Sequence, residues 1–163
     1  MRRYERADAE LHAGGGYAAE SEAAQIAHSL GIEDRVLGQP LKTLSGGQRR
    51  RVELARILFS GAETMLLDEP TNHLDADSIL WLRDFLKAHR GGLIVISHDT
   101  GLLEATVNKV LHLDANRAEI DVYNMGWTAY LTQRETDEKR RKRERMNAEN
   151  KAKTLTDQAN KMR

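Results

Sequence analysis

The sequence of 163 residues contains no cysteine, only two prolines and few aromatic residues. Without cysteine, neither a disulfide framework nor a cysteine-ligated metal site is possible. Because aromatic residues make up only 5% of the chain, we expect an aliphatic core. No apolar run approaches the ~20 residues of a membrane-spanning helix, and no apolar segment of a signal peptide follows the first residues. These absences predict a soluble, cytoplasmic protein.

Charged residues, by contrast, are abundant and unevenly distributed. They make up 31% of the chain, and 25 basic residues balance 25 acidic ones. Residues 134–163 nevertheless carry a net charge of +5, from 11 basic and 6 acidic side chains. Such an asymmetry indicates a folded body followed by a basic tail that meets an anionic partner.

Helical and strand-like patterns alternate through much of the chain. Apolar residues at helical spacing predict three helices, over about 19–30, 46–60 and 76–89. Gly31 and Gly61 would close the first two, and Asp75 or Asp77 would cap the third. Short apolar runs at 64–67 and 93–96 predict buried strands, the second typical of a parallel sheet covered on both faces. This alternation predicts an α/β fold.

The remaining segments lie at the two ends of the chain. Residues 1–12 favour a helix and precede three glycines that predict a flexible joint. Two strands joined by a turn are predicted over 107–123. From about 128 to 163 the chain favours one long helix of ~50 Å. Its second half carries a heptad seam that predicts one partner helix, formed by Ala148, Ala152, Leu155, Ala159 and Met162.

The first motif with chemical meaning opens the predicted helix at 46–60. Ser45 and Gln48 form an S-x-x-Q pair, which is the pattern of a capping box. Gly46 and Gly47 leave the backbone N–H groups at this helix end approachable. Free N–H groups, the positive end of the helix dipole and a serine hydroxyl together predict an anion site.

The second group of functional residues follows the predicted strands. Asp68 and Glu69 end the first strand, and His98 follows the second. In open α/β sheets, ligands bind outside the carboxyl ends of the strands. A phosphate-facing helix end beside these carboxylates therefore indicates nucleotide chemistry.

Together these motifs resemble those of the ABC ATPases. The stretch 44–48 is similar to their signature motif, 65–69 to Walker B with its adjacent glutamate, and His98 to the switch histidine. Asp75 stands where that family has its D-loop. The string 67–75, with a long charged helix after the cassette, resembles the ABC-F subfamily, whose soluble members carry two cassettes and in many cases act on the ribosome.

This resemblance implies ATP and Mg²⁺ as cofactors and a role for each matched residue. Asp68 would hold Mg²⁺ through water, Glu69 would orient or deprotonate the attacking water, and His98 would contact the γ-phosphate. Asp75 would link two facing sites. The signature residues would grip the γ-phosphate of a nucleotide held by a second cassette, with Gln48 supporting the helix end that carries Ser45, Gly46 and Gly47.

One feature of the family is missing. The sequence has no G-x-x-x-x-G-K-[ST] and no Gly-Lys pair at all, so the phosphate-cradling P-loop is absent. We therefore expect a fragment of a first cassette, with a helical subdomain portion at 1–43, the signature, Walker B and switch portion at 44–126, and a basic linker helix at 127–163. Its fold class would be a partial P-loop-type cassette with an incomplete, mainly parallel sheet. Such a fragment is expected to be inactive alone and prone to self-association.

Several functions stay open at this level. The basic residues of the last helix would either be solvated or lie along RNA phosphates of the ribosome or tRNA; they are Arg140, Arg141, Lys142, Arg143 and Arg145. The alternatives to an ABC-F protein are the cytoplasmic ATPase of a membrane transporter, a DNA-repair ATPase of the SMC type, and a non-catalytic helical interaction module. Elongation control, antibiotic protection and ribosome assembly are not distinguished.

Overall fold

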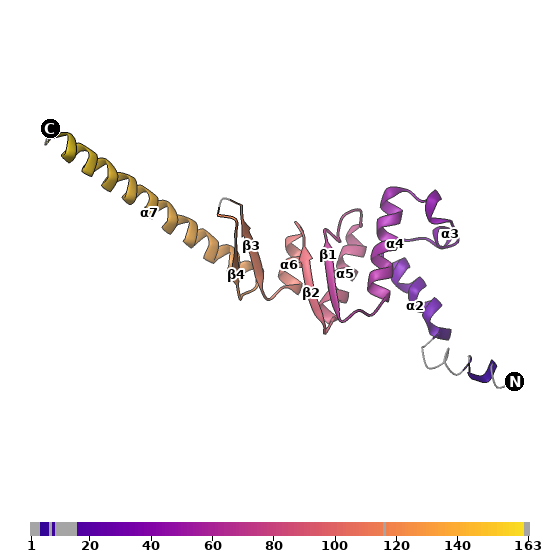
Figure 1. Ribbon diagram of the computed structural model, residues 1–163. Coiled ribbons are helices and arrows are strands. Elements are labelled where there is room, and N and C mark those ends of the chain that lie inside the picture. The colour runs from indigo at the N-terminus through magenta and orange to yellow at the C-terminus, as the bar shows by residue number, and fades with distance from the viewer. Residues whose placement is uncertain (1–3, 7, 9–15, 116, 162–163) are drawn as a thin grey trace. The chain divides into compact units, whose positions relative to one another are not determined.

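The computed structural model describes residues 4–6, 8, 16–115 and 117–161, which form two compact units (Figure 1). Unit 1 is Met1–Thr106 and unit 2 is Val107–Arg163. The three functional segments predicted from the sequence remain a prediction, and the boundary between the units lies at neither of their junctions. The helix predicted over 1–12 falls largely outside the described residues, as does most of the glycine joint.

Unit 1 alternates helices with two strands. Its described elements are α2 (Gly16–Ser29), α3 (Asp34–Leu37), the 3₁₀ turn η1 (Leu41–Thr43), α4 (Gly46–Phe59), β1 (Thr64–Asp68), α5 (Ala76–Ala88), β2 (Gly92–Ile96) and α6 (Thr100–Thr106). The three predicted helices and both predicted strands are present. The short helices α3 and α6 and the turn η1 were not predicted, because segments of three to seven residues are too short to show a helical period.

Strands β1 and β2 pair in parallel, which confirms the α/β prediction. Their register places Thr64 opposite Gly92 and Asp68 opposite Ile96, so both strands end at the same edge of the pair. Residues that directly follow the two strands are thereby brought side by side. The sheet thus positions Glu69 next to the segment that contains His98.

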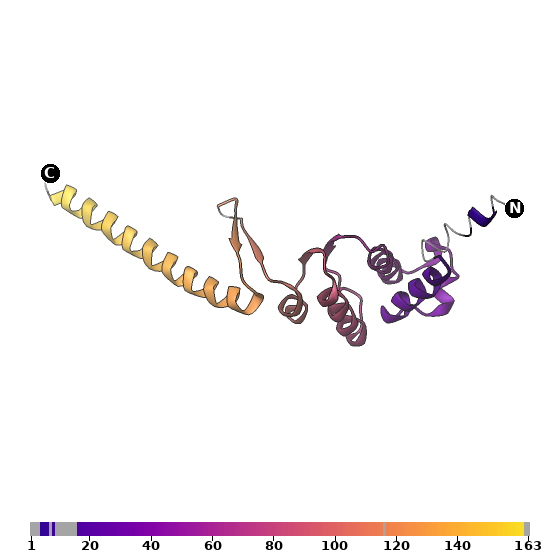
Figure 2. The same ribbon diagram turned by 90° about the horizontal axis from the view of Figure 1, so that it is seen from below.

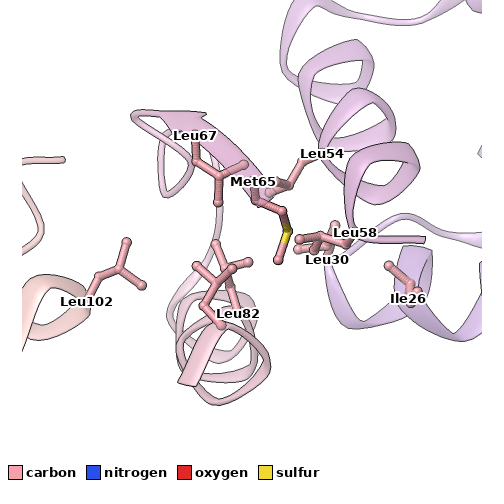
Figure 3. Close-up of a cluster of buried hydrophobic side chains, with 9 residues drawn as sticks. Ile26, Leu30, Leu54, Leu58, Met65, Leu67, Leu82 and Leu102 are labelled. Atoms are coloured by element: carbon pink, nitrogen blue, oxygen red, sulfur yellow. The ribbon is translucent and has the colours of Figure 1, made fainter. Parts of the chain in front are cut away.

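The core of unit 1 lies on one face of this strand pair (Figure 3). Side chains from α2, α4, α5, α6 and β1 meet there, and the buried members are Ile26, Leu30, Leu54, Leu58, Met65, Leu67, Leu82, Leu86 and Leu102. In Figure 2, α5 and α6 lie on the same side of the strands. The core is aliphatic, as the composition predicts.

The opposite face of β1 and β2 is exposed in the part of the chain that the structure describes, as expected for an incomplete sheet. Leu66, Ile94 and Ile96 are 69%, 54% and 62% exposed. Their neighbours alternate inward, so that Met65 and Leu67 are buried. The run of apolar residues identifies a strand suited to two covered faces, but the described helices cover only one of them.

Unit 2 is a hairpin followed by a long helix. Strands β3 (Val110–Asp114) and β4 (Glu119–Tyr123) are antiparallel, and α7 (Trp127–Lys161) follows them. Both the hairpin and the long helix were predicted. Alternate side chains of the hairpin face away from the unit's interior and are more than half exposed; these are Leu111, Leu113, Ile120 and Val122.

The start of α7 is held on the hairpin by aromatic packing. Tyr130 is only 2% exposed, and its hydroxyl lies 3.2 Å from Nδ1 of His112. The rings of Tyr123 and Trp127 lie 5.0 and 5.3 Å from that of Tyr130. Further along the helix, Leu155 of the predicted heptad seam is 57% exposed. None of the helices that the structure describes is both long and apolar enough to cross a membrane.

Candidate functional site

The signature-like stretch forms the beginning of α4. Ser45 is the N-cap residue, and its hydroxyl accepts a hydrogen bond from the backbone N–H of Gln48 at 3.2 Å. In return, Oε1 of Gln48 accepts a hydrogen bond from the backbone N–H of Ser45 at 2.9 Å. The predicted capping box is therefore present, and Gln48 supports the helix end directly.

Of the two glycines at this helix end, Gly46 is open and Gly47 is partly covered by His73. A Cβ atom added to Gly46 would meet no heavy atom within 4 Å. One added to Gly47 would lie 3.7 Å from the side chain of His73. The open backbone N–H groups and the helix dipole make this end suitable for an anion, as the sequence indicates.

The chain makes a tight bend at the end of β1. Asp68 is exposed, and Glu69 adopts a left-handed backbone conformation with φ of 46°. The backbone N–H of Glu69 donates to the carbonyl of Ile96 at 2.7 Å, which ties the bend to the end of β2. A non-glycine residue with positive φ is uncommon and concentrates at functional sites.

This bend brings Glu69 and His98 together although 29 residues separate them in the sequence. The backbone N–H of His98 donates to Oε2 of Glu69 at 3.3 Å. The imidazole Nε2 of His98 lies 3.4 Å from Oε1 of the same carboxylate. The side chain of His98 is 97% exposed and that of Glu69 is 21% exposed. The two side chains thus lie together at the carboxyl ends of both strands.

Asp75 is the N-cap residue of α5, and its Oδ1 accepts a hydrogen bond from the backbone N–H of Ser78 at 2.8 Å. Hydrogen bonds from Ser78 lower the pKa of Asp75, and the nearby charge of Arg51 lowers it further. The guanidinium of Arg51 donates to the carbonyl of Gly31 at 2.8 Å. Asp75 therefore lies where the ends of α2 and α5 meet the side of α4.

A shallow hollow of about 190 Å³ lies beside Asp68 and Glu69. Its wall includes Arg50, Arg51 and Asn72, but none of the four residues 45–48. The structure thus brings Glu69, His98 and Asp68 to one strand edge, while the residues of the α4 N-terminus lie outside this hollow.

The residues present fit one end of a magnesium nucleotide. Asp68 is an exposed carboxylate at a strand end, which suits a Mg²⁺ ion that keeps most of its water. No group of three or more acidic or histidine side chains within the described part of the chain forms a metal cage. The phosphate-cradling glycine loop is absent from the sequence. The fit therefore concerns only the metal beside Asp68.

Three residues of this region were not identified from the sequence. Arg51 links α4 to the end of α2 through its hydrogen bond to the carbonyl of Gly31. His73 packs against Gly47. Asp99 accepts a hydrogen bond from the backbone N–H of Leu102 at 2.8 Å and so caps α6 directly after His98. An aspartate three residues before a buried leucine is a capping pattern that could have revealed α6.

Comparison with known proteins gives matches in sequence. Residues 2–72 match the family described as ABC transporter. The chain is 36% identical over 134 residues to the putative ATP-binding protein YdiF of Bacillus subtilis, which covers 82% of this chain and 21% of that protein. It is 40% identical over 116 residues to the probable ATP-binding protein YheS of Escherichia coli, covering 71% and 18%. The chain thus spans about a fifth of the length of these relatives.

Two further matches concern translation and fold. The energy-dependent translational throttle protein EttA of Mycobacterium tuberculosis is 42% identical over 93 residues, which are 57% of this chain and 16% of that protein. The post-hydrolysis dimer of the ATP-binding cassette MJ0796, bound to ADP and Pi, matches with a TM-score of 0.52 and 25% identity. That match covers 64% of this chain and 46% of the cassette. The chain is therefore similar in sequence to the ATPase domain of ABC transporters and shares its α/β fold with an ATP-binding cassette.

Proposed function

We propose that this chain is the signature, Walker B and switch-histidine portion of an ABC-F-type ATPase, followed by the start of its linker helix. In the longer protein it would couple ATP binding and hydrolysis to translation on the ribosome. A cytoplasmic location follows from that proposal. The similarity to a protein named as a translational throttle supports it.

The observation that carries the proposal is the pair formed by Glu69 and His98. Water activation by a carboxylate requires a base within reach of the nucleophile and open to the substrate. Glu69 follows the end of strand β1 and has a left-handed backbone conformation. Its Oε1 lies 3.4 Å from Nε2 of His98. If Glu69 were only a solvated carboxylate after a strand, neither its positive φ nor its contact with His98 would be required.

Each predicted site residue has a role in this proposal. When bound, the magnesium nucleotide supplies the phosphoryl group that water attacks. Asp68 would hold the metal through water, Glu69 would orient the attacking water and accept its proton, and His98 would contact the γ-phosphate. Asp75 would connect the facing sites of two cassettes. The α4 N-terminus, with Ser45, Gly46, Gly47 and Gln48, would bind the γ-phosphate held by the second cassette.

Because the sequence has no P-loop, we expect the isolated chain neither to bind ATP tightly nor to hydrolyse it. Phosphate release by the purified chain measures this directly, and turnover that the Glu69→Gln variant abolishes would contradict it.

In a longer in-frame chain that carries a P-loop, Glu69→Gln should lower hydrolysis about 10²–10⁴-fold. Glu63→Gln, a change at an exposed carboxylate before β1, is the matched control. Coding DNA upstream of Met1 without a P-loop would count against the fragment proposal.

The basic stretch of α7 is proposed to contact RNA phosphates of the ribosome or tRNA. Lysine and arginine on a helix give salt-dependent affinity with little sequence preference. Reversal of all five charges should remove tRNA or ribosome binding and flatten its salt dependence. Unchanged affinity and salt slope would exclude an RNA role for the stretch that comprises Arg140, Arg141, Lys142, Arg143 and Arg145.

A second candidate is the ATPase subunit of a membrane transporter. The family description matched by residues 2–72 favours it. The 35-residue charged helix α7 favours the ABC-F proposal instead. Co-purification with a membrane subunit from detergent extracts, and no sedimentation with ribosomes, would establish the transporter function.

A further inference from the structure

Two acidic and two basic side chains converge between the hairpin and helix α7 of unit 2. Asp114 ends β3, Asp121 lies in β4, Arg117 lies in the turn between the strands, and Arg141 projects from α7. A third acid, Glu119 of β4, pairs with Arg117 alone, with 3.0 Å between its Oε2 and Nη1 of Arg117. No part of the proposed nucleotide site includes these residues.

Within the hairpin, Arg117 joins the two acids. Its Nε donates to Oδ2 of Asp114 at 2.8 Å, and its Nη2 donates to Oδ2 of Asp121. Hydrogen bonding to Asp114 raises the pKa of Arg117 above its ordinary value. The side chains of Asp114 and Asp121 are only 15% and 26% exposed. Charges in such positions are screened less than those fully in solvent.

From the helix, Arg141 reaches the same two oxygen atoms. Its Nη1 lies 3.5 Å from Oδ2 of Asp114, and its Nη2 lies 3.4 Å from Oδ2 of Asp121. Two nitrogens of one planar guanidinium thus bridge both strands of the hairpin. Arg141 lies 11 residues, or about 16 Å, along the helix from Tyr130, which is the aromatic contact at the helix start.

The other basic residues of the stretch differ from Arg141 in their ion pairs, although Lys142 and Arg145 line the same hollow beside the hairpin. Arg140 pairs along the helix with Asp137 at 3.4 Å and with Glu144 at 4.0 Å. Among the residues that the structure describes, Lys142, Arg143 and Arg145 have no acidic group within 4.0 Å. The basic stretch therefore contains residues with acidic partners and, within the described part of the chain, residues without one.

We propose that Arg141 is a positioning residue that clamps α7 to the hairpin through Asp114 and Asp121. With Tyr130 it fixes the helix at two points and so sets its direction. Lys142, Arg143 and Arg145 lie beyond the second point and are the residues that meet phosphates of a nucleic acid. This last part rests on the proposed function, whereas the clamp itself does not.

The direction of α7 relative to the hairpin tests the clamp without any ligand. The chain has no cysteine, so Ile120→Cys and Asn150→Cys give two clean spin-label sites, both exposed and outside the cluster. Electron-spin distance measurement should give one narrow distribution in this background. Arg141→Gln should broaden it, because it removes both ion pairs to the hairpin.

Arg143→Gln is the matched control, because it removes the same charge two residues further along. It should leave the distance distribution narrow. Equal widths for Arg141→Gln and Arg143→Gln, with helix content unchanged by circular dichroism, would overturn the clamp.

The nucleic-acid part is tested by the salt dependence of tRNA binding. Each single change to glutamine at 142, 143 or 145 should lower the slope by about one unit, as expected for a lost phosphate contact. Arg141→Gln should leave the slope unchanged. If Arg141→Gln lowered the slope by the same amount, the assignment of phosphate contacts to residues 142, 143 and 145 alone would be wrong. Absence of any tRNA binding would refute the proposed RNA role while leaving the spin-label result to decide the clamp.

Discussion

At the scale of single residues, Gly31 occupies the point where α2 ends and two polar side chains approach the backbone. Its φ is 69°, and its backbone N–H bonds to the carbonyl of His28 at 2.9 Å. A Cβ atom here would lie 3.0 Å from Nη1 of Arg51 and 3.1 Å from Oδ2 of Asp75. Only glycine meets both the conformational and the spatial requirement.

Gly31→Ala should therefore destabilise unit 1 by about 1–2 kcal/mol from its left-handed backbone alone. Gly38→Ala is the control, because Gly38 has ordinary φ and no heavy atom within 4 Å of an added Cβ. Urea unfolding followed by Trp81 fluorescence in a Trp127→Phe background measures the difference. Equal midpoints for the two alanine variants would show that Gly31 has no special role.

Asp75 gives a prediction for pH. Its pKa lies below the ordinary value of 3.8 in the folded chain, because Ser78 donates hydrogen bonds to the carboxylate. The stabilisation from this carboxylate is fully present above that ordinary value and is lost as pH falls through the lower folded pKa. The stability difference between the natural chain and Asp75→Asn should therefore stay constant from pH 7 to about pH 5 and shrink below about pH 4 in urea titrations. A difference that does not shrink below about pH 4 would contradict the assignment.

At the scale of elements, α5 shows how one helix combines a core face and an exposed face. Leu82 is fully buried, whereas Leu80, two residues earlier, is 46% exposed. Leu82→Ala should cost about 2–5 kcal/mol of unfolding free energy through lost burial and a cavity. Leu80→Ala should change it by less than about 0.5 kcal/mol. Similar losses at both positions in urea unfolding would mean that the helix packs on more than one side.

Sequence patterns predicted the helices and strands of unit 1 better than they predicted which faces of these elements are covered and which elements contact one another. The capping box of Ser45 and the strands before Glu69 and His98 follow from local spacing, and their meeting follows from parallel strand register. The exposure of Ile94 does not follow, because a run of apolar residues does not tell how many layers cover a strand. The contact from Arg51 to Gly31 depends on how two helices pack, and no local pattern contains that information.

At the scale of the whole molecule, both units present apolar sheet surface. Leu66, Ile94 and Ile96 form the open face of β1 and β2. The hairpin adds a second open face, and exposed contiguous apolar surface of this kind favours association. The edges of two-stranded sheets add unpaired backbone groups, which favour pairing with another chain.

We therefore expect the isolated chain to associate with itself in a concentration-dependent way. The double change Leu66→Lys and Ile94→Lys should weaken this association in sedimentation experiments. Leu80→Lys, which adds the same charge on an exposed helix position, should not. A monodisperse monomer of the unmodified chain over the accessible concentration range would contradict this prediction.

The length of α7 has one more consequence. A rigid helix relates sequence position to angle, since each residue turns the following side chain by about 100° and advances it by 1.5 Å. Deleting one residue after Arg141 would rotate every distal side chain around the axis, although the composition of the basic stretch would hardly change. Deleting seven would return those side chains to nearly the same side, about 10 Å nearer the hairpin. The spacing of charges along α7 therefore sets two quantities: how far the basic side chains lie from the hairpin and on which side of the helix they project. Insertions or deletions of different lengths change these two quantities separately.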